Sequence, residues 1–532
     1  MQKWVDTYIS DAVIGGRRGF AAEVEMSEFF DELVEKGFGG SLDYSLAFDM
    51  MDPLITCDTL KGLGWPPGLV DLIGSVWLRQ SRWISWDRHV AEGPLEVSQS
   101  MPQGDAWSVL MMIIWMEAGA KNVRRQVAED CKHMVYIDDR SWTTGEAKTN
   151  MRVADAWRQW SSEMCLKENV AKTQFVATTE RKKEELKQAV GEDGQEYIKE
   201  VLHVLGTHST TARQRKTLPK EQQRIEEAAA TVDRLGALPI GWEAKAQYIR
   251  SFGLSKALWG WVARAPTMAD ANKFQKAVWN ALRTPSGCNQ HIRNVLIGGT
   301  LNMRFVLESR MFAVALRRIS KGGLQWTKAA QTLVARVRKT MKSNGWQEQD
   351  AFRWRHRLTK TEVHLTQKMD LSKEVSAKIA HDLREGWRAE EWEKFCHATR
   401  RDSALLQGTP YDGARAAAAR KACTRDGWHR SVLLGTFRSP AALTHKDEKE
   451  QECPWCHNHL GHHDHIFWLC PQRPHGPERP RCELQARLGW PMAKDDSSEA
   501  DEAVMTYMSS TAKKVLDERY HNAVQSGSGQ EA

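Results

Sequence analysis

Long hydrophobic runs are missing from this sequence. The most apolar segment, VLMMIIWM at residues 109–116, is too short to cross a bilayer. The first residues, MQKWVDTYISDAV, carry Lys3, Asp6 and Asp11 at positions where a secretory signal would be apolar. These absences predict a soluble intracellular protein that has no membrane partner.

Internal repeats are also missing, and most of the cysteines are isolated. No fixed period recurs along the 532 residues, which argues against a solenoid or a propeller. Hydrophobic residues make up 41% of the chain and the formal net charge is +7, so a large core and a polyanionic partner are both compatible with the composition. Seven of the ten cysteines stand alone and are expected to be reduced core residues: Cys57, Cys131, Cys165, Cys288, Cys396, Cys423 and Cys482.

The pattern of strands and helices changes along the chain. Residues 22–36 have helical spacing, SLDYS indicates a short strand, and the segment from Asp105 to Glu129 indicates a long helix. Up to about residue 206 this mixture predicts an α+β layer, with helices on one face of a mainly antiparallel sheet. Beyond residue 215 strand signals almost vanish, which predicts a helical second half.

Two acidic residues stand side by side inside a strand-like segment, MVYIDDRSWTT, at residues 134–144. An isolated pair such as Asp138 and Asp139 would simply suit a hairpin turn. However, Asp43 in SLDYSLAFD follows another short strand, and three neighbouring carboxylates repel one another unless cations neutralise them. Carboxylates are ligands that Mg²⁺ prefers, and a pair of ions can hold both oxygens of a phosphoryl transfer.

Two further segments add groups suited to a nucleotide. SMPQGDAWS places Gln103 and Gly104 ahead of a helix N-terminus, where backbone N–H groups are free to face anions or bases. Lys172 in KENVAKTQF precedes a strand, a position from which its ammonium could reach a phosphate.

The ordered blocks SLDYSLAFD, SMPQGDAWS, VYIDD, LKENVAKTQF and VLGT resemble the motifs of reverse transcriptases, most closely those of non-LTR retrotransposons and group II introns. The resemblance covers residues 12–206 well and a helical thumb loosely. It implies a reverse-transcriptase palm followed by an all-α thumb. In chain order it implies a truncated fingers remnant (1–40), a palm (41–210), a helical thumb (211–300), a helical, basic, Trp-containing region (301–445), a CCHC zinc knuckle (446–492) and a polar, partly disordered tail (493–532).

The resemblance also implies roles for single residues. Asp43 and Asp138 resemble the residues that bind two catalytic Mg²⁺ ions, with Asp139 beside them, and Lys172 resembles the lysine that protonates the leaving pyrophosphate. Phe48 resembles the bulky residue that excludes a ribose 2′-hydroxyl. The remaining implied positions are Gln103 and Gly104 under the incoming nucleotide, Leu205 and Gly206 at the primer end, and Arg17 and Arg18 at the end of one fingers block.

Three neighbouring positions are open to simpler explanations. Asp49 and Asp105 match motif positions, but capping a helix explains each of them more simply. Arg140 follows the acid pair and could pair with a phosphate or neutralise an aspartate. The sequence leaves both alternatives open.

A cysteine and histidine cluster near the C-terminus has the spacing of a metal site. In ECPWCHNHLGHHDHIFWLCP, Cys453, Cys456, His465 and Cys470 form a closed tetrahedral set for one structural Zn²⁺. His463 is the alternative third ligand, and the four-residue spacer to the last cysteine favours His465. The pattern resembles the CCHC knuckle of non-LTR element proteins. Free thiols in a His-rich loop are the simpler alternative.

A basic stretch lies ahead of this cluster, with Trp346 and Trp354 among the cations. Such a stretch can follow a nucleic-acid backbone and stack bases, although a solvated helix face with core tryptophans is favoured slightly. The basic residues are Arg336, Arg338, Lys339, Lys342, Arg353, Arg355, Arg357 and Lys360.

Together these features predict an RNA-directed DNA polymerase of a retroelement. It would act on an RNA template, a DNA primer and dNTPs, and the family suggests a nuclear location. The missing early fingers block makes a truncated, weakly active or inactive remnant that binds nucleic acid the main alternative. A zinc-stabilised helical scaffold for protein partners is the third hypothesis, and the ordered blocks argue against it.

Overall fold

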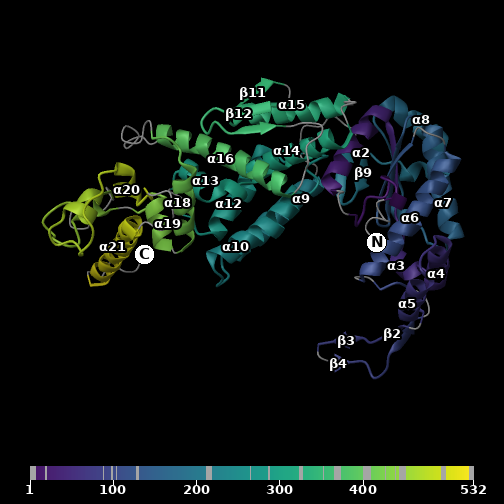
Figure 1. Ribbon diagram of the computed structural model, residues 1–532, viewed down its shortest axis with the longest axis horizontal. Coiled ribbons are helices and arrows are strands. Elements are labelled where there is room, and N and C mark those ends of the chain that lie inside the picture. Colours follow the sequence, from purple (N-terminus) through teal and green to yellow (C-terminus); the bar gives the residue numbers. More distant parts are fainter. Residues whose placement is uncertain are drawn as a thin grey trace. The chain divides into compact units, whose positions relative to one another are not determined.

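The structure is a computed structural model of the whole chain (Figure 1). The residues that it describes are 7–17, 21–78, 80–87, 89–97, 100–102, 105–127, 131–210, 219–263, 265–284, 288–322, 328–350, 353–364, 373–398, 409–425, 427–437, 439–442, 451–492 and 499–525.

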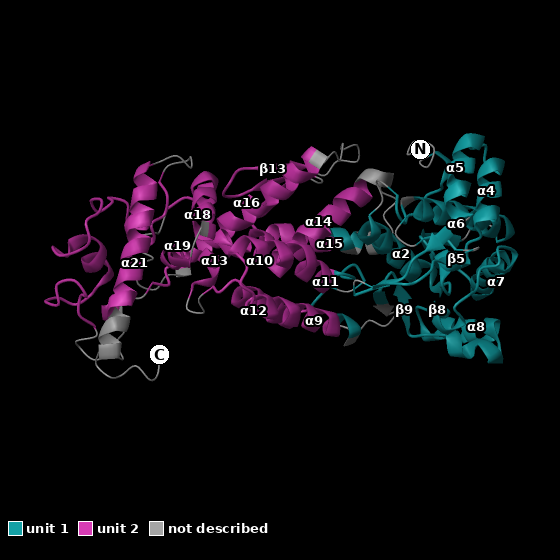
Figure 2. Cartoon of the chain, turned by 90° about the horizontal axis from the view of Figure 1, so that it is seen from below, with its two compact units in different colours: residues 1–221, 259–266, 324–334 teal, residues 222–258, 267–323, 335–532 magenta. Residues whose placement is uncertain are grey.

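The chain forms two compact units, which Figure 2 colours separately. Unit 1 consists of residues 1–221, 259–266 and 324–334, and unit 2 of residues 222–258, 267–323 and 335–532. Each unit has its own clusters of buried apolar side chains.

Unit 1 is a mixed layer of helices and antiparallel strands. Its helices are α2 (Ala22–Lys36), α3 (Ala47–Met50), α4 (Pro53–Gly62), α5 (Pro67–Trp77), α6 (Ala106–Gln126), α7 (Ala147–Glu163) and α8 (Glu180–Val190). Its strands are β1 (Phe38–Leu42), β2 (Gln80–Arg82), β3 (Ser85–Trp86), β4 (His89–Val90), β5 (Leu95–Val97), β6 (Cys131–Tyr136), β7 (Asp139–Thr144), β8 (Gln174–Ala177), β9 (Val201–Val204) and β10 (Thr207–Thr210).

The central sheet has the order β6-β7-β1-β8, and every neighbouring pair is antiparallel, as predicted. The strand expected at SLDYS begins earlier, because Gly39 and Gly40 belong to β1 rather than interrupting it. Position 40 requires glycine, because a Cβ at Gly40 would lie 2.3 Å from the ring of Trp142 on the adjacent strand. The buried tryptophan therefore takes the space that a side chain would need.

Helices cover both faces of this sheet, so the prediction of helices on one face is wrong. Side chains alternate across a strand. Val135 and Phe175 join the core that α6 and α7 cover, while their neighbours Met134 and Val176 join a second core with α2 and β9. The α2 residue Leu33 contributes to that second core.

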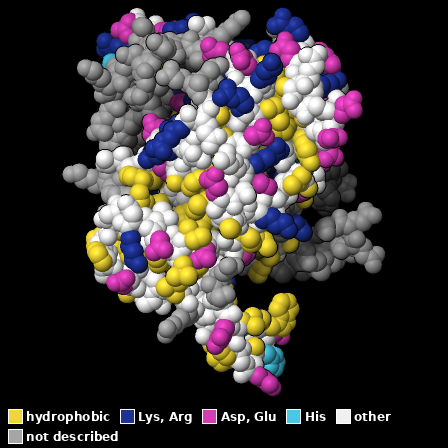
Figure 3. Space-filling view, turned by 90° about the vertical axis from the view of Figure 1, so that its right-hand side faces the viewer, with side chains coloured by type: hydrophobic (Ala, Val, Ile, Leu, Met, Phe, Trp, Pro, Cys, Tyr) yellow, Lys and Arg dark blue, Asp and Glu magenta, His cyan; other side chains and the backbone are white. Residues whose placement is uncertain are grey.

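The segment RWISWDRHV, expected as one strand, folds into a narrow ribbon instead. β2 pairs with β5, and β3 pairs with β4. The ribbon exposes large apolar side chains, among them Trp86 at 82% exposure, and Figure 3 shows hydrophobic side chains gathered on this projection. A single strand cannot form because the chain reverses direction after Trp86, where Asp87 has a φ of 44° and β4 returns alongside β3.

Unit 2 is mostly helical. Its helices are α9 (Pro219–Leu235), which begins in unit 1, α10 (Trp242–Tyr248), α11 (Leu254–Leu258), α12 (Met268–Ala281), α13 (Gln290–Leu296), α14 (Met303–Gly322), α15 (Lys328–Ser343), which also begins in unit 1, α16 (Lys373–Ala398), α18 (Gly413–Arg425), α19 (Gly427–Leu433), α20 (Glu483–Leu488) and α21 (Glu499–Gln525). Its strands are β11 (Trp346–Asp350), β12 (Arg353–His356) and β13 (Glu362–His364).

Two parts of unit 2 differ from the prediction. β11, β12 and β13 form an antiparallel sheet where only helices were expected. Residues 493–532 were expected to be a polar, partly disordered tail. The described part of that tail is α21, which buries Val504, Met508 and Val515. These residues are four and seven positions apart, so they lie on one face of the helix, although the composition of the segment is polar.

Among the helices described here, none combines the length and the apolar character that a membrane crossing requires.

Candidate functional site

The acid pair lies at a hairpin turn, as predicted. Tyr136 and Asp139 form the last pair of β6 and β7, which leaves Ile137 and Asp138 as the turn. Ile137 has a φ of 57°, which is unfavourable for a β-branched residue. Such a conformation persists only when the surrounding structure holds it, and it is typical of functional sites.

The sheet register brings Asp43 to the same place. Leu42 is the partner of Arg140 in the β1–β7 pairing. One residue further along this register, Asp43 stands opposite Asp139. Asp43 directly follows β1, Asp138 lies in the turn and Asp139 begins β7, and the three are close enough that the charge of Asp43 raises the pKa of the other two.

The electrostatics of the three acids reflect this crowding. Burial first, and then the charges of Asp138 and Asp43, raise the pKa of Asp139 to about 6. Burial also raises the pKa of Asp138, with the charge of Asp43 adding to the effect. The raised pKa values show that the ionised carboxylates lack enough positive charge around them, and a bound divalent cation would supply that charge.

Lys172 reaches the cluster because its segment pairs with the end of β1. The backbone N–H of Asn169 donates to the carbonyl of Asp43 at 2.9 Å, and that of Ser45 donates to Lys167 at 2.8 Å. The Lys172 ammonium then lies 2.5 Å from Asp43 Oδ2, and this hydrogen bond raises the pKa of the lysine. The lysine side chain is 65% exposed, so the ion pair contributes little to stability.

The ion-pair partner of Arg140 is Glu168, which neither alternative named, although the charge of Arg140 also opposes the raised pKa values of Asp138 and Asp139. Its fully buried guanidinium forms two hydrogen bonds with Glu168, at 2.7 and 2.8 Å. It also lies 3.5 Å from the ring centroid of Tyr44 and donates to Ser161 Oγ at 3.1 Å. The side chain points away from Asp139 because neighbours on a strand face opposite sides.

This arrangement forms a second layer that the sequence did not reveal. Tyr44 follows Asp43 directly, and Arg140 follows Asp139 directly, so two consecutive pairs of residues each supply one acid and one anchor. Glu168 and Ser161 connect the anchors, since Ser161 contacts both the Tyr44 hydroxyl and the Glu168 carboxylate. The arginine directly after the acid pair was the sequence signal for this layer, and it is weak because nothing local identifies Glu168 as its partner.

The described residues just before Gln103 and Gly104 are held against α3, the helix that carries Phe48. The N–H of Met101 donates to the Phe48 carbonyl at 2.8 Å, and the hydroxyl of Ser100 donates to Asp49 at 3.1 Å. Gln103 and Gly104 lie outside the described residues. The prediction that Asp49 caps a helix is wrong: it lies inside α3 and anchors this loop.

Asp105 does cap a helix, as predicted. Its carboxylate accepts the N–H of Trp107 at the start of α6 and also the indole N–H of Trp77, both within 3.2 Å. The cap fixes the start of α6 directly after the loop.

Arg17 supports backbone close to the acid turn. Its guanidinium donates to the carbonyls of Ser10 and Val13 at 2.6 and 2.8 Å. Val13 in turn bridges to Val135 on β6, and a Cβ at Gly15 would lie 2.4 Å from the backbone N of Ile137. The segment that contains Arg17 is thus in contact with the hairpin, while contact with a triphosphate stays a prediction. Arg18 lies outside the described residues.

Leu205 and Gly206 form the turn between β9 and β10. Both have positive φ, 50° and 68°, as a tight two-residue hairpin requires. The Leu205 carbonyl accepts the indole N–H of Trp259 at 2.8 Å. Their expected role at a primer end stays a prediction.

The cysteine cluster also closes as predicted. Ligand atoms of Cys453, Cys456, His465 and Cys470 all lie within 4.8 Å of one another, so they form a candidate metal site. His465 opens a π-helical turn (His465–Leu469), and Cys470 follows it directly. His463, the alternative ligand, instead lies against Asp464 and the ring of Phe467. The geometry favours His465.

The basic stretch is largely structural. Trp346 and Trp354 are 2% and 1% exposed, so the interpretation that they stack bases is wrong and the alternative of core tryptophans is confirmed. Arg353 pairs with Glu362 across β12 and β13, and Arg357 pairs with Glu390 and Glu393 of α16. These acids neutralise part of the positive charge.

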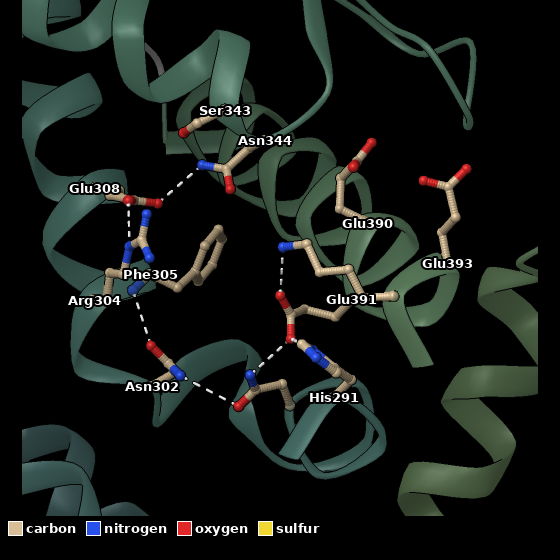
Figure 4. Close-up of polar contacts among 12 residues, drawn as sticks. His291, Asn302, Arg304, Phe305, Glu308, Ser343, Asn344, Glu390, Glu391 and Glu393 are labelled. Atoms are coloured by element: carbon tan, nitrogen blue, oxygen red, sulfur yellow. Dashed lines mark hydrogen bonds and ion pairs between the residues drawn. The ribbon is translucent and has the colours of Figure 1, made fainter. Parts of the chain in front are cut away.

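A second polar cluster lies in unit 2 (Figure 4). The Glu391 carboxylate accepts hydrogen bonds from His291, Asn294 and Lys394, at 2.8, 2.8 and 2.9 Å. Burial by itself raises the pKa of Glu391, but these hydrogen bonds outweigh burial and lower the pKa to about 2. The carboxylate is thus satisfied by its own neighbours and holds α13 against α16.

Comparison with known proteins supports the assignment of the N-terminal region. Residues 10–216, fewer than half of the chain, match the family model of reverse transcriptase (RNA-dependent DNA polymerase). No curated protein matches the sequence. Similar solved structures include the telomerase of Candida tropicalis without ligand (10% identity, TM-score 0.34) and that of Candida albicans in complex with a fragment of telomeric RNA (11% identity, TM-score 0.26). Each match covers 64% of this chain and 57% of the telomerase chain. The chain therefore contains a reverse-transcriptase-like region within a mixed, mostly helical α/β fold.

Proposed function

We propose that the acid cluster of unit 1 is the active site of an RNA-directed DNA polymerase. The observation that supports this most directly is the meeting of Asp43, Asp138 and Asp139 at one end of the sheet, with raised pKa values for the last two. The match of residues 10–216 to reverse transcriptases gives the chemistry. The reaction joins a dNTP to a primer 3′-hydroxyl and releases pyrophosphate.

The residues divide the work as follows. Asp43 and Asp138 would hold two Mg²⁺ ions, which when bound acidify the 3′-hydroxyl and balance the triphosphate charge. Arg140 and Glu168 hold the two strands that present the acids. Lys172, whose ammonium reaches the acid cluster through its hydrogen bond to Asp43, supplies a proton to the leaving pyrophosphate. Phe48 stands on α3 beside the loop that leads to Gln103 and Gly104, where the incoming nucleotide would lie.

Primer extension tests this proposal. Wild-type protein, an RNA template, a DNA primer and dNTPs are incubated with Mg²⁺, and Asp138→Asn is expected to reduce extension at least about 1,000-fold, because it removes a metal ligand and its charge. Asp43→Ala should do the same. Asp58→Asn is the matched control, since Asp58 is a 78% exposed acid on α4.

The results of this assay distinguish an active polymerase from a remnant that only binds nucleic acid. Extension by the wild type that Asp138→Asn leaves intact would remove the mechanism. Absence of extension by the wild type, with binding of template retained, would favour the alternative, a remnant that binds nucleic acid. One observation favours that alternative: the Arg17 guanidinium is already engaged by the Ser10 and Val13 carbonyls.

We further propose that the cysteine cluster binds one structural Zn²⁺. Three thiolates and one imidazole are the ligands of closed tetrahedral zinc sites. Cys456→Ser should lower the zinc content to well below one ion per chain, whereas His463→Ala should leave it unchanged. Equal zinc contents in the wild type and Cys456→Ser would contradict the assignment.

The finer classification follows from the ordered blocks. We propose a retroelement enzyme of the non-LTR or group II intron type, with a palm over residues 41–210, a helical thumb over 211–300 and a knuckle over 446–492. Its partners would be an RNA template and a DNA primer, and a nuclear location would fit this class.

A further inference from the structure

Unit 2 contains a pocket that the polymerase reaction does not use. A cavity of about 520 Å³ opens between the end of α9, the start of α10, the end of α12 and the start of α19. We call it the Trp242–Trp428 pocket. Its lining is Leu238, Pro239, Ile240, Trp242, Lys245, Ala281, Leu282, Arg283, Gly427, Trp428, Arg430 and Ser431. This volume lies in the range of small-ligand sites.

The charge of the lining has one sign. Lys245, Arg283 and Arg430 contribute three cations, and none of the described lining residues is acidic. Lys245 is only 5% exposed, and its ammonium donates to the Gly236 carbonyl at 2.8 Å. Burial, and then the charge of Arg283, lower the pKa of Lys245. A buried ammonium beside a second cation is unfavourable unless an anion joins it.

The aromatic side chains of the lining favour a flat ligand. Trp242 and Trp428 present indole surface to the cavity, and the guanidinium carbon of Arg430 lies 5.6 Å from the Trp242 ring centroid. The indole N–H of Trp242 is buried and has no hydrogen-bond partner among the described residues. Buried donors are normally satisfied, so an unpartnered indole N–H on a residue that lines the cavity is unusual.

Anionic charge and a flat heteroaromatic ring occur together in a nucleotide. Tryptophan stacks bases of any sequence, and lysine and arginine bind phosphate. We propose that the Trp242–Trp428 pocket binds a nucleobase that carries a phosphate group. An acidic peptide would satisfy the cations but would leave the indole surfaces without a planar partner. The inference goes beyond the polymerase proposal, because all lining residues belong to unit 2.

Equilibrium dialysis of the full-length protein tests this inference with AMP, adenosine and inorganic phosphate as separate probes. AMP is expected to bind at one site per chain. Adenosine and phosphate should each bind at least about tenfold more weakly, because each lacks half of the recognised chemistry. The Asp138→Asn variant, assayed without added Mg²⁺, should bind AMP like the wild type, which separates this site from the acid cluster.

Variants of the pocket provide the structural control. Arg283 is exposed, so Arg283→Glu leaves the core intact and is expected to weaken AMP binding about tenfold. Lys245→Met, which removes the buried charge, should weaken it similarly. Lys276→Glu, a charge reversal at an exposed residue of α12 outside the pocket, should have no effect.

Competition identifies the source of the ligand. A short single-stranded oligonucleotide that displaces AMP would indicate a strand, and failure to displace it would indicate a free nucleotide. Both results support the pocket. Equal binding of adenosine and AMP, absence of AMP binding, preference for an acidic peptide, or AMP binding that Arg283→Glu leaves unchanged would overturn the inference.

Discussion

The Arg140–Glu168 pair predicts a large local destabilisation when one partner loses its charge. Arg140 is fully buried and Glu168 is 16% exposed on its side chain, with two hydrogen bonds between them. Breaking a buried pair at one side leaves an uncompensated charge, which destabilises by about 3–5 kcal/mol. Because Glu168 retains some contact with solvent, we expect Glu168→Gln to destabilise β1 and β7 by about 3 kcal/mol, the lower end of that range.

Amide hydrogen exchange measures this effect locally. When opening is fast and reversible, about 3 kcal/mol corresponds to an increase in exchange rate of roughly 150-fold for protected amides of β1 and β7. Peptides from α12 in unit 2 provide an internal control. Primer extension should fall with the same variant, because the two strands present Asp43 and Asp138.

A second variant tests the reason for the effect. Arg140→Met combined with Glu168→Met removes both charges and keeps most of the volume, so it should recover much of the lost protection. The reasoning is refuted if Glu168→Gln changes exchange by less than about fivefold, or if the double variant is as labile as the sum of its single changes.

Three further predictions follow from individual contacts. Lys172→Gln should increase Mg²⁺ affinity, because the ammonium competes for the same carboxylate, yet lower the maximal extension rate; equal affinity and rate would contradict both roles. Glu391→Gln should lower the free energy of unfolding of unit 2 at pH 7 by about 3 kcal/mol, measured as a lower urea midpoint. The difference from the wild type should shrink as the pH falls from 4.5 towards 2, because a carboxyl with a lowered pKa stabilises the fold only while it is ionised. Gly15→Ala should reduce extension, because its Cβ would displace the backbone of Ile137, whereas Gly62→Ala, with nothing within 4 Å, should not; extension assays of the pair decide this.

The sequence predicts best where the local pattern alone determines the geometry. The hairpin that presents Asp138 follows from alternating side chains on either side of two turn residues. The cluster of Cys453, Cys456, His465 and Cys470 follows from spacing, because a short knuckle and one helical turn leave few other arrangements. In both cases the interacting residues are close in the chain or are linked by one strand register.

The sequence predicts poorly where a residue has a partner far along the chain. In the sequence, Asp49 has the pattern of a helix cap, and only the fold shows that Ser100, 51 residues later, donates to it. In the sequence, Glu168 cannot be told apart from the many acidic residues of the surface, and only the fold places Arg140 against it. In the sequence of β12, polar and apolar side chains alternate over Arg353, Trp354 and Arg355. This alternation is typical of a strand, but the segment was interpreted as a basic cluster because so many cations surround it.

The buried Arg140 explains why the acid cluster remains short of positive charge. A fold that used the three acids only for stability would have turned this guanidinium towards them. Instead Arg140 pairs with Glu168, so its charge offsets the acids only in part, and Lys172 forms an ion pair with Asp43. Three carboxylates against the Lys172 ammonium leave two negative charges. Burial first, and then the charges of Asp138 and Asp43, raise the pKa of Asp139 to about 6. Two negative charges are what a divalent cation neutralises, so the orientation of Arg140 is itself an argument for a metal-dependent site.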